Sequence, residues 1–125
     1  MPPGIHYSRI ESLETAPGFP DVHYTLKGKS GTLELKCQPL PTRCPFSEEK
    51  RGLRKTQRIW IRDELAAGGR VILVLQAKDD IFFLPGKYYA ELDHLTVSEI
   101  AIRASLIWVV GAALQSGSLS EILMN

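Results

Sequence analysis

The sequence predicts an α/β protein with a central mixed β-sheet that is flanked by helices. Three features indicate this class: two short alternating segments around the turn GKSG at residues 28–31, the apolar β-branched run RVILVLQ at residues 70–76, and helical periodicity before and after that run. The 125 residues are 44% hydrophobic and 23% charged, a composition typical of a globular protein. This length predicts a single domain over residues 1–125.

Composition also narrows the class of function. A net charge of +1 means that any contact with nucleic acid must come from local clusters of basic residues. The longest apolar run, residues 106–114, is too short to cross a bilayer, and the first residues lack the apolar core of a secretory signal. Cys37 and Cys44 do not have the spacing of a zinc site, so reduced thiols are favoured over a disulfide. We therefore expect no membrane partner and a cytoplasmic location.

The first third of the chain predicts a helix, a hairpin and a loop. Residues 5–15 have the spacing of a short helix, which the Pro-Gly pair at residues 17–18 would end. Residues 21–27 and 32–38 are short alternating segments rich in β-formers, and we expect them to pair as a β-hairpin. Residues 39–45 contain three prolines, which cannot continue a central strand, so this segment is predicted to be a loop.

The rest of the chain predicts two longer helices around two strands. Residues 48–67 are predicted to form the main helix. Four residues at a spacing of four share the face that is expected to point inward: Leu53, Gln57, Ile61 and Leu65. Residues 70–76 are typical of a strand buried on both faces, and residues 81–84 of a further short strand. A capping box of Thr96 and Glu99 begins a final helix over about residues 97–115. That helix is apolar around much of its circumference, so a second copy of the chain is expected to cover it in a homodimer.

The hairpin carries the residues with the clearest chemistry. Alternation along TLELK places Glu34 and Lys36 on one face of their strand, and Asp21 begins the neighbouring strand. Two carboxylates that converge there would repel each other unless a cation lies between them, and Mg²⁺ prefers such oxygen ligands. A lysine beside the ion offsets the charge of a phosphate and orients a water molecule. The alternative to a metal site is that Glu34 and Lys36 form an ordinary ion pair on a solvated surface.

The helix predicted at residues 48–67 adds an amide and a group of cations. Gln57 lies on the apolar stripe and must find polar partners near the sheet, either at the edge of the core or at a reacting water or phosphate. Basic residues suited to phosphate contacts accompany it: Arg51, Arg54, Lys55 and Arg58. Part of this charge can instead pair within the helix.

The segments GFPD, LELK, KTQ followed by Trp60, and GGRVILVL occur in an order that resembles the PD-(D/E)xK nuclease superfamily. They are most similar to the small VRR-NUC-like and Holliday-junction-resolvase-like nucleases often found in phages. The resemblance covers residues 5 to about 76 and implies a restriction-endonuclease-like core, within about residues 5–84, built on a four-stranded mixed sheet. It also implies Mg²⁺ or Mn²⁺ as cofactor, cleavage that leaves a 5′-phosphate, and the host cytoplasm as location if a phage encodes the protein.

The resemblance further implies roles for individual residues. The expected catalytic set is Glu11, Asp21, Glu34, Lys36 and Gln57. Asp21 and Glu34 would bind the metal with the carbonyl of Leu35, and Glu14 is the alternative to Glu11 in the first helix.

These observations together predict a Mg²⁺-dependent DNA endonuclease, with branched or junction DNA as one option for its substrate. One alternative is a nucleic-acid-binding module that has the same fold without catalysis. Another is a structural or interaction protein that uses its apolar final helix as the binding surface.

Overall fold

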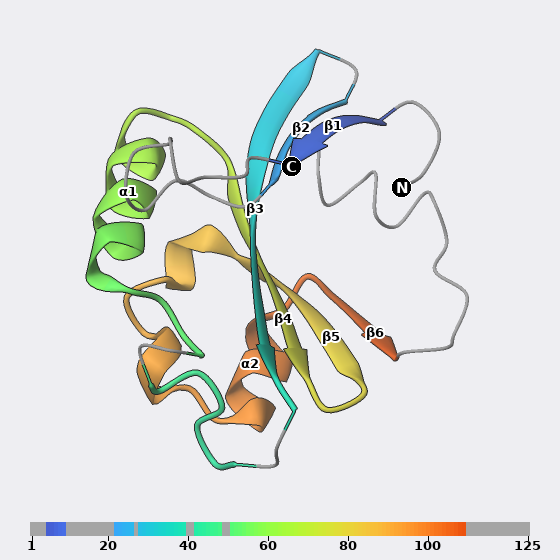
Figure 1. Cartoon of the computed structure of the whole chain (residues 1–125), viewed down its shortest axis with the longest axis vertical. Coiled ribbons are helices and arrows are strands. Elements are labelled where there is room, and N and C mark those ends of the chain that lie inside the picture. Colours follow the sequence, from blue (N-terminus) through green and yellow to red (C-terminus); the bar gives the residue numbers. More distant parts are fainter. Residues whose placement is uncertain (1–4, 10–21, 27, 40–41, 49–50, 110–125) are drawn as a thin grey trace.

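A six-stranded mixed β-sheet, with its strands in sequence order, forms the centre of the computed structural model (Figure 1). The strands are β1 Ile5–Arg9, β2 Val22–Leu26, β3 Lys29–Gln38, β4 Val71–Ala77, β5 Asp80–Pro85 and β6 Leu106–Val109. Neighbouring strands are antiparallel except for β3 and β4, which are parallel. The structure describes residues 5–9 (backbone only), 22–26, 28–39, 42–48 and 51–109. The predicted α/β class with a central mixed sheet is confirmed, with two strands more than the four expected.

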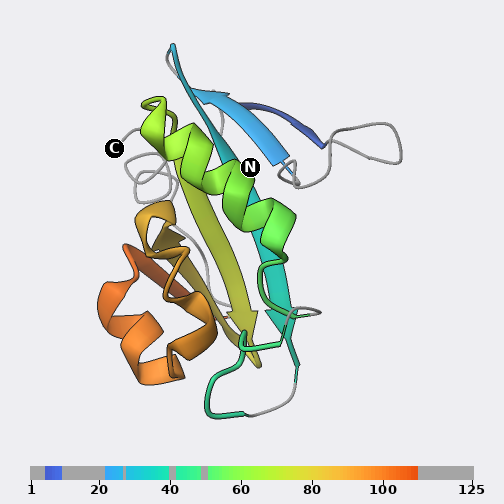
Figure 2. The same ribbon diagram turned by 90° about the vertical axis from the view of Figure 1, so that its left-hand side faces the viewer.

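Helices cover one face of this sheet. Helix α1 (Lys55–Ala66) connects β3 to β4, and a crossover of this kind is what a parallel strand pair requires. Helix α2 (Val97–Arg103) lies on the same side of the sheet as α1 (Figures 1 and 2). Two short 3-10 helices, η1 (Gly86–Tyr88) and η2 (Leu92–His94), lie between β5 and α2 in the sequence.

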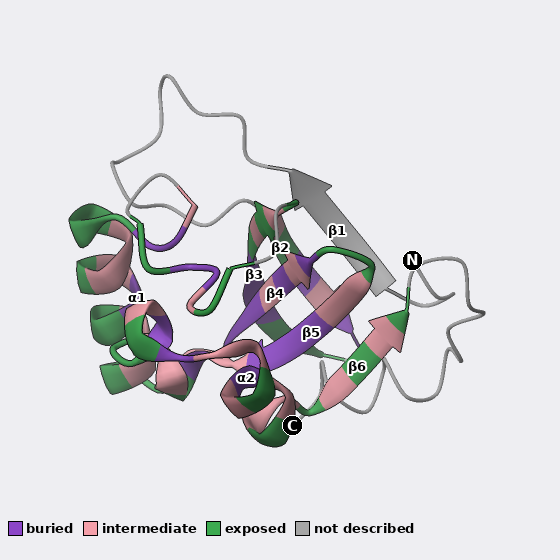
Figure 3. Ribbon diagram, turned by 90° about the horizontal axis from the view of Figure 1, so that it is seen from below, coloured by how far each residue is buried: buried purple, intermediate pink, exposed green. Residues whose placement is uncertain are grey.

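The central strands are buried on both faces, as Figure 3 shows for β4 and β5. Leu73 and Leu75 belong to the first core cluster, which also contains Ile61 of α1 and Ile100 of α2. Residues on the opposite face form a second cluster: Tyr24, Leu26, Leu33, Ile72 and Phe83. This double burial confirms the prediction made from the apolar run at residues 70–76.

The N-terminal segment differs from its prediction. Residues 5–9 form strand β1 rather than the start of a helix, and β1 pairs antiparallel with β2. The pairing gives hydrogen-bond partners to the backbone groups on the edge of β2 that does not face β3. This stabilisation outweighs the local helix propensity of residues 5–9. The remainder of the predicted helix, with Glu11 and Glu14, lies outside the described residues, and so does Asp21.

The main helix is shorter than expected. Helix α1 begins at Lys55 instead of residue 48, because the chain turns back immediately before it. The backbone N–H groups of Arg51 and Gly52 both donate to the carbonyl of Glu48, at 3.0 and 2.6 Å. Gly52 also lies against the carbonyl of Phe46, so closely that any Cβ at this position would collide with it. The predicted hairpin, and the strands expected at residues 70–76 and 81–84, shift by only a few residues at their ends.

The final helix is the largest error of prediction. Helix α2 ends at Arg103, and Leu106–Val109 forms β6 along the edge of β5. As a strand, this apolar segment places Leu106 and Trp108 against the second core cluster. The helical surface expected to bind a second copy is therefore wrong for residues 104–109, and residues 110–115 lie outside the described part. Homodimerisation stays a prediction without that surface.

Candidate active site

Strand β3 places Glu34 and Lys36 on the helix-covered face of the sheet. Glu34 is aligned with Leu73 and Lys36 with Leu75, and both leucines belong to the first core cluster. Leu33 lies on the other face, in the second cluster, as the alternation along the strand requires. The Glu–Lys pair therefore faces α1, which excludes the alternative of a fully solvated surface pair.

Glu34 is buried to a degree unusual for a carboxylate. Its side chain is 1% exposed and that of Lys36 is 13% exposed, with 3.5 Å between Lys36 Nζ and Glu34 Oε1. A carboxylate removed from water is costly unless hydrogen bonds and an opposite charge compensate it. Lys36 supplies the charge, and a second partner comes from α1.

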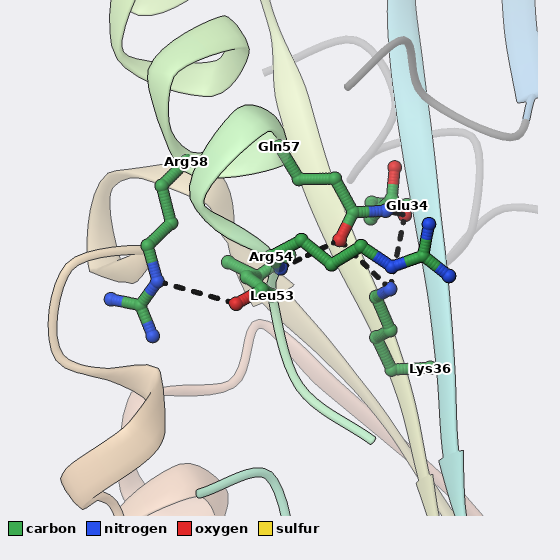
Figure 4. Close-up of polar contacts among 6 residues, drawn as sticks. All are labelled: Glu34, Lys36, Leu53, Arg54, Gln57 and Arg58. Carbon is green, nitrogen blue, oxygen red and sulfur yellow. Dashed lines mark hydrogen bonds and ion pairs between the residues drawn. The ribbon is translucent and has the colours of Figure 1, made fainter. Parts of the chain in front are cut away.

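That partner is Gln57, which lies in the first turn of α1 and points toward β3 (Figure 4). Its Nε2 donates to Glu34 Oε1 at 2.7 Å, and its Oε1 accepts from Lys36 Nζ at 3.0 Å. The same Oε1 accepts from the backbone N–H of Arg54 at 2.9 Å. The amide thus connects both residues of the strand to the start of the helix. Glu34, Lys36 and Gln57 form a polar group that we call the Glu34 cluster.

The four predicted phosphate contacts separate into different environments. Arg54 and Lys55 are exposed at the start of α1, next to the Glu34 cluster, and Arg51 is half-buried in the preceding turn. Arg58 extends away from Glu34 (Figure 4), where its Nε donates to the carbonyl of Leu53 at 3.4 Å. Its Nη2 also lies 3.6 Å from Asp93 Oδ1, in an ion pair. Arg58 therefore serves a structural contact between α1 and η2.

The described residues provide only part of a metal site. Among them, no group of three or more His, Cys, Asp and Glu side chains could hold an ion. Glu34 supplies one carboxylate, and the carbonyl of Leu35 belongs to the adjacent residue of β3. These are oxygen donors of the kind that Mg²⁺ prefers, so the donors present fit a hard cation in chemistry although not in number. The other predicted ligand, Asp21, and the supporting Glu11 lie outside the described residues.

Three further features lie away from the Glu34 cluster. A surface pocket of about 380 Å³ is lined by Cys37, Pro39, Gln76, Lys78 and Asp79. Alternation along β3 places Cys37 on the face opposite Glu34, so this pocket is not the candidate site. Cys37 and Cys44 are both free thiols. Burial raises the pKa of Tyr24, and the charge of Arg70 partly opposes this effect. Tyr24 belongs to the second core cluster, on the face of the sheet opposite Glu34, so it is not part of the candidate site.

Sequence reasoning missed the bond between Arg54 and Gln57. The signal was present, because an amide three residues after the residue that precedes a helix often accepts a hydrogen bond from that residue's backbone. A helix that starts at residue 48, as the sequence predicts, conceals this spacing.

No protein-family model matches the sequence, and no curated protein matches it. The structure is similar to that of Hjc, a Holliday junction resolvase from the archaeal hyperthermophile Archaeoglobus fulgidus, with a TM-score of 0.45 and 16% sequence identity over 67% of this chain. The match spans 65% of the Hjc chain, slightly less than two thirds of its length. The α/β class itself follows from the sheet and the helices described above.

None of the helices in the described part of the chain is long and apolar enough to cross a bilayer.

Proposed function

We propose that this chain is a Mg²⁺- or Mn²⁺-dependent endonuclease that hydrolyses phosphodiester bonds in DNA. The observation that carries the proposal is the buried carboxylate of Glu34, which has Lys36 beside it and is bonded to Gln57. A core position that served only stability would favour an apolar side chain, because a buried ion pair rarely adds net stability. The same residues are those that resemble the motif of the PD-(D/E)xK nucleases.

The metal is proposed to bind at Glu34, with Asp21 and the carbonyl of Leu35 as further ligands. Val22, the first described residue of β2, lies opposite Leu33 of β3. In the sequence, Asp21 directly precedes Val22 and Glu34 directly follows Leu33. A divalent ion held there would supply Lewis-acid stabilisation of the negative charge that develops on the phosphate.

Lys36 and Gln57 act on the phosphate and on the water. Gln57 accepts a hydrogen bond from Lys36 Nζ and so restricts the position of the ammonium group. Held in this place, the ammonium orients the attacking water and offsets negative charge as it grows on the phosphate oxygens. Glu11 is proposed to support the metal-binding residues.

Binding to DNA is assigned to cations near the cluster, chiefly Arg54 and Lys55 at the exposed start of α1, with Arg51 beside them. Such phosphate contacts make affinity strongly dependent on salt. Cleavage of two strands of a junction or duplex would be served by a homodimer with two symmetric sites.

Cleavage assays on linear and branched DNA, with Mg²⁺ or with EDTA, test this function directly. The wild-type protein should cut in Mg²⁺ and not in EDTA. Glu34→Gln removes the charge with little change of shape and should lower the rate by at least about 1,000-fold, because the reaction loses a charged group at its centre. Circular dichroism should confirm that the variant is folded.

Other outcomes identify the alternatives. DNA binding without cleavage in either Mg²⁺ or Mn²⁺ would indicate a non-catalytic binding module. No salt-sensitive binding to any DNA would favour an interaction protein and contradict the proposal.

A further inference from the structure

We propose that Arg54 binds the phosphate group that is hydrolysed, whereas the other basic residues near α1 contact DNA elsewhere or serve the fold. This inference rests on the proposed nuclease function and assigns to Arg54 a role in the reaction step itself. Three observations support it: how its backbone is held, where its side chain extends, and which charges surround it.

The backbone of Arg54 is fixed by the candidate site. Its N–H donates to Gln57 Oε1 at 2.9 Å, and the Nε2 of the same amide donates to Glu34 Oε1 at 2.7 Å. One side chain therefore lies between the Arg54 main chain and the buried carboxylate. Because two hydrogen bonds of one amide connect Arg54 to Glu34, the position of the Arg54 backbone relative to Glu34 is well defined. A side chain that contacts the phosphate in the transition state needs such a fixed position.

The side chain of Arg54 extends toward Glu34 and Lys36, while Arg58, one turn later, extends in the other direction (Figure 4). Among the described residues, no ion pair or side-chain hydrogen bond engages the Arg54 guanidinium. Arg58 and Arg62 differ, because they pair with Asp93 and Asp63 respectively. Since α1 has no acidic residue in its first turn, the charge of Arg54 is not neutralised by its own helix either.

A guanidinium in this place suits the chemistry of phosphodiester hydrolysis. An oxygen of the attacking water forms a bond to phosphorus, and the bond from phosphorus to the leaving 3′-oxygen breaks. The leaving oxygen ends as a hydroxyl with one proton of the water, and the other proton stays with the new 5′-phosphate or passes to solvent. Negative charge grows on the phosphate oxygens during this step, and the planar guanidinium donates two parallel hydrogen bonds to them.

The experiment compares Arg54→Ala and Arg54→Lys with Arg62→Ala. Arg62 is a matched control on the same helix, because its side chain is 60% exposed and its substitution removes the same charge. Two quantities are measured with the full-length protein: the single-turnover cleavage rate at saturating DNA in Mg²⁺, and the affinity for the same DNA in EDTA, where no cleavage occurs. Thermal unfolding verifies that each variant is folded.

Arg54→Ala should lower the saturated rate by about 100-fold or more, the usual effect of losing a donor to a developing anion. Arg54→Lys should recover no more than about tenfold of that loss, because an ammonium cannot donate in the paired geometry. Affinity in EDTA should fall by less than the rate falls. Arg62→Ala should cut at the wild-type rate.

Two results would overturn the inference, and they are distinguishable. If Arg54→Ala cuts within about threefold of the wild-type rate once DNA is saturating, Arg54 is an ordinary backbone contact and the nuclease function still stands. If the wild-type protein cuts no DNA in Mg²⁺ or Mn²⁺, the nuclease function fails and the role of Arg54 fails with it.

Discussion

The two α-helices in the described part of the chain begin in almost the same backbone geometry, but their first residues make different contacts. Arg54 precedes α1 with φ −73° and ψ 160°, and Thr96 precedes α2 with φ −75° and ψ 165°. In both, the side chain three residues later accepts a hydrogen bond from this preceding residue, at 2.9 Å for Gln57 and 3.0 Å for Glu99. Only α2 has a second, reciprocal hydrogen bond, in which the hydroxyl of Thr96 accepts from the backbone N–H of Glu99 at 3.2 Å.

The start of α2 is therefore complete in itself, while that of α1 is shared with the sheet. Among the described residues, the Glu99 carboxylate accepts hydrogen bonds from Thr96 alone, whereas the Gln57 amide bonds to Glu34 and Lys36 as well as to Arg54. Arginine has no acceptor with which to cap a helix, and such a position costs on the order of 1 kcal/mol relative to Ser or Thr. Helix α1 therefore lacks a stabilising cap, and it has instead a cation, Arg54, and an amide, Gln57, beside the buried carboxylate of Glu34. Departures from local rules of this kind are expected at functional sites.

The largest expected difference between the two helix starts is in catalysis. Gln57→Leu removes three hydrogen bonds, leaves Lys36 less restricted and should lower the cleavage rate by roughly 10–100-fold, as loss of a residue that orients metal-site groups commonly does. Glu99→Gln at the equivalent position of α2 should leave the rate unchanged. Single-turnover cleavage measures both. Equal losses in the two variants would mean that Gln57 matters only for helix stability.

A second prediction reverses the direction of the effect on stability. Arg54→Ser gives α1 the acceptor that it lacks, so the free energy of unfolding should rise by about 0.5–1 kcal/mol while cleavage falls. Urea denaturation measures the change, with Thr96→Ser as the control that exchanges one good cap for another. An Arg54→Ser variant less stable than wild type would show that the guanidinium also stabilises the folded state.

Local patterns predicted the centre of the site well. Alternation along β3 is strict, so Glu34 and Lys36 had to share a face, and their alignment with Leu73 and Leu75 decides which face it is. The four-residue spacing with Ile61 likewise predicted that Gln57 points toward the sheet.

Long-range partners could not be predicted in this way. Arg58 pairs with Asp93 of η2, and no local sequence pattern predicts that contact; a phosphate contact of Arg58 stays a prediction. Residues Leu106–Val109 are apolar in every position, so they fit a buried helix or a strand equally well locally. The edge of β5 decides between them, because Ser105 donates its N–H to the carbonyl of Phe83 at 2.8 Å just before pairing begins.

The smallest expected effect concerns pH. The backbone N–H and the hydroxyl of Thr96 both donate to Glu99, and these bonds hold the pKa of Glu99 below its ordinary value of 4.5, with a minor contribution from Arg103. A carboxyl whose pKa is lower in the folded state stabilises the fold above about pH 4.5, and this contribution is lost as the pH falls through the folded value. At α1 the corresponding residue is an amide, which does not titrate.

Glu99→Gln should therefore unfold more easily than wild type at pH 7, and the difference should be smaller at pH 3, where more of the carboxylate is protonated. Urea midpoints at the two pH values measure it, and the effect is small because Glu99 is only partly buried. Repeating the series in high salt separates the two causes, since salt screens the contribution of Arg103 and leaves the hydrogen bonds of Thr96 largely intact. If wild type and Glu99→Gln lose stability in parallel from pH 7 to pH 3, the start of α2 does not depend on this charge. The contrast with α1 would then lie only in what Gln57 and Arg54 contact.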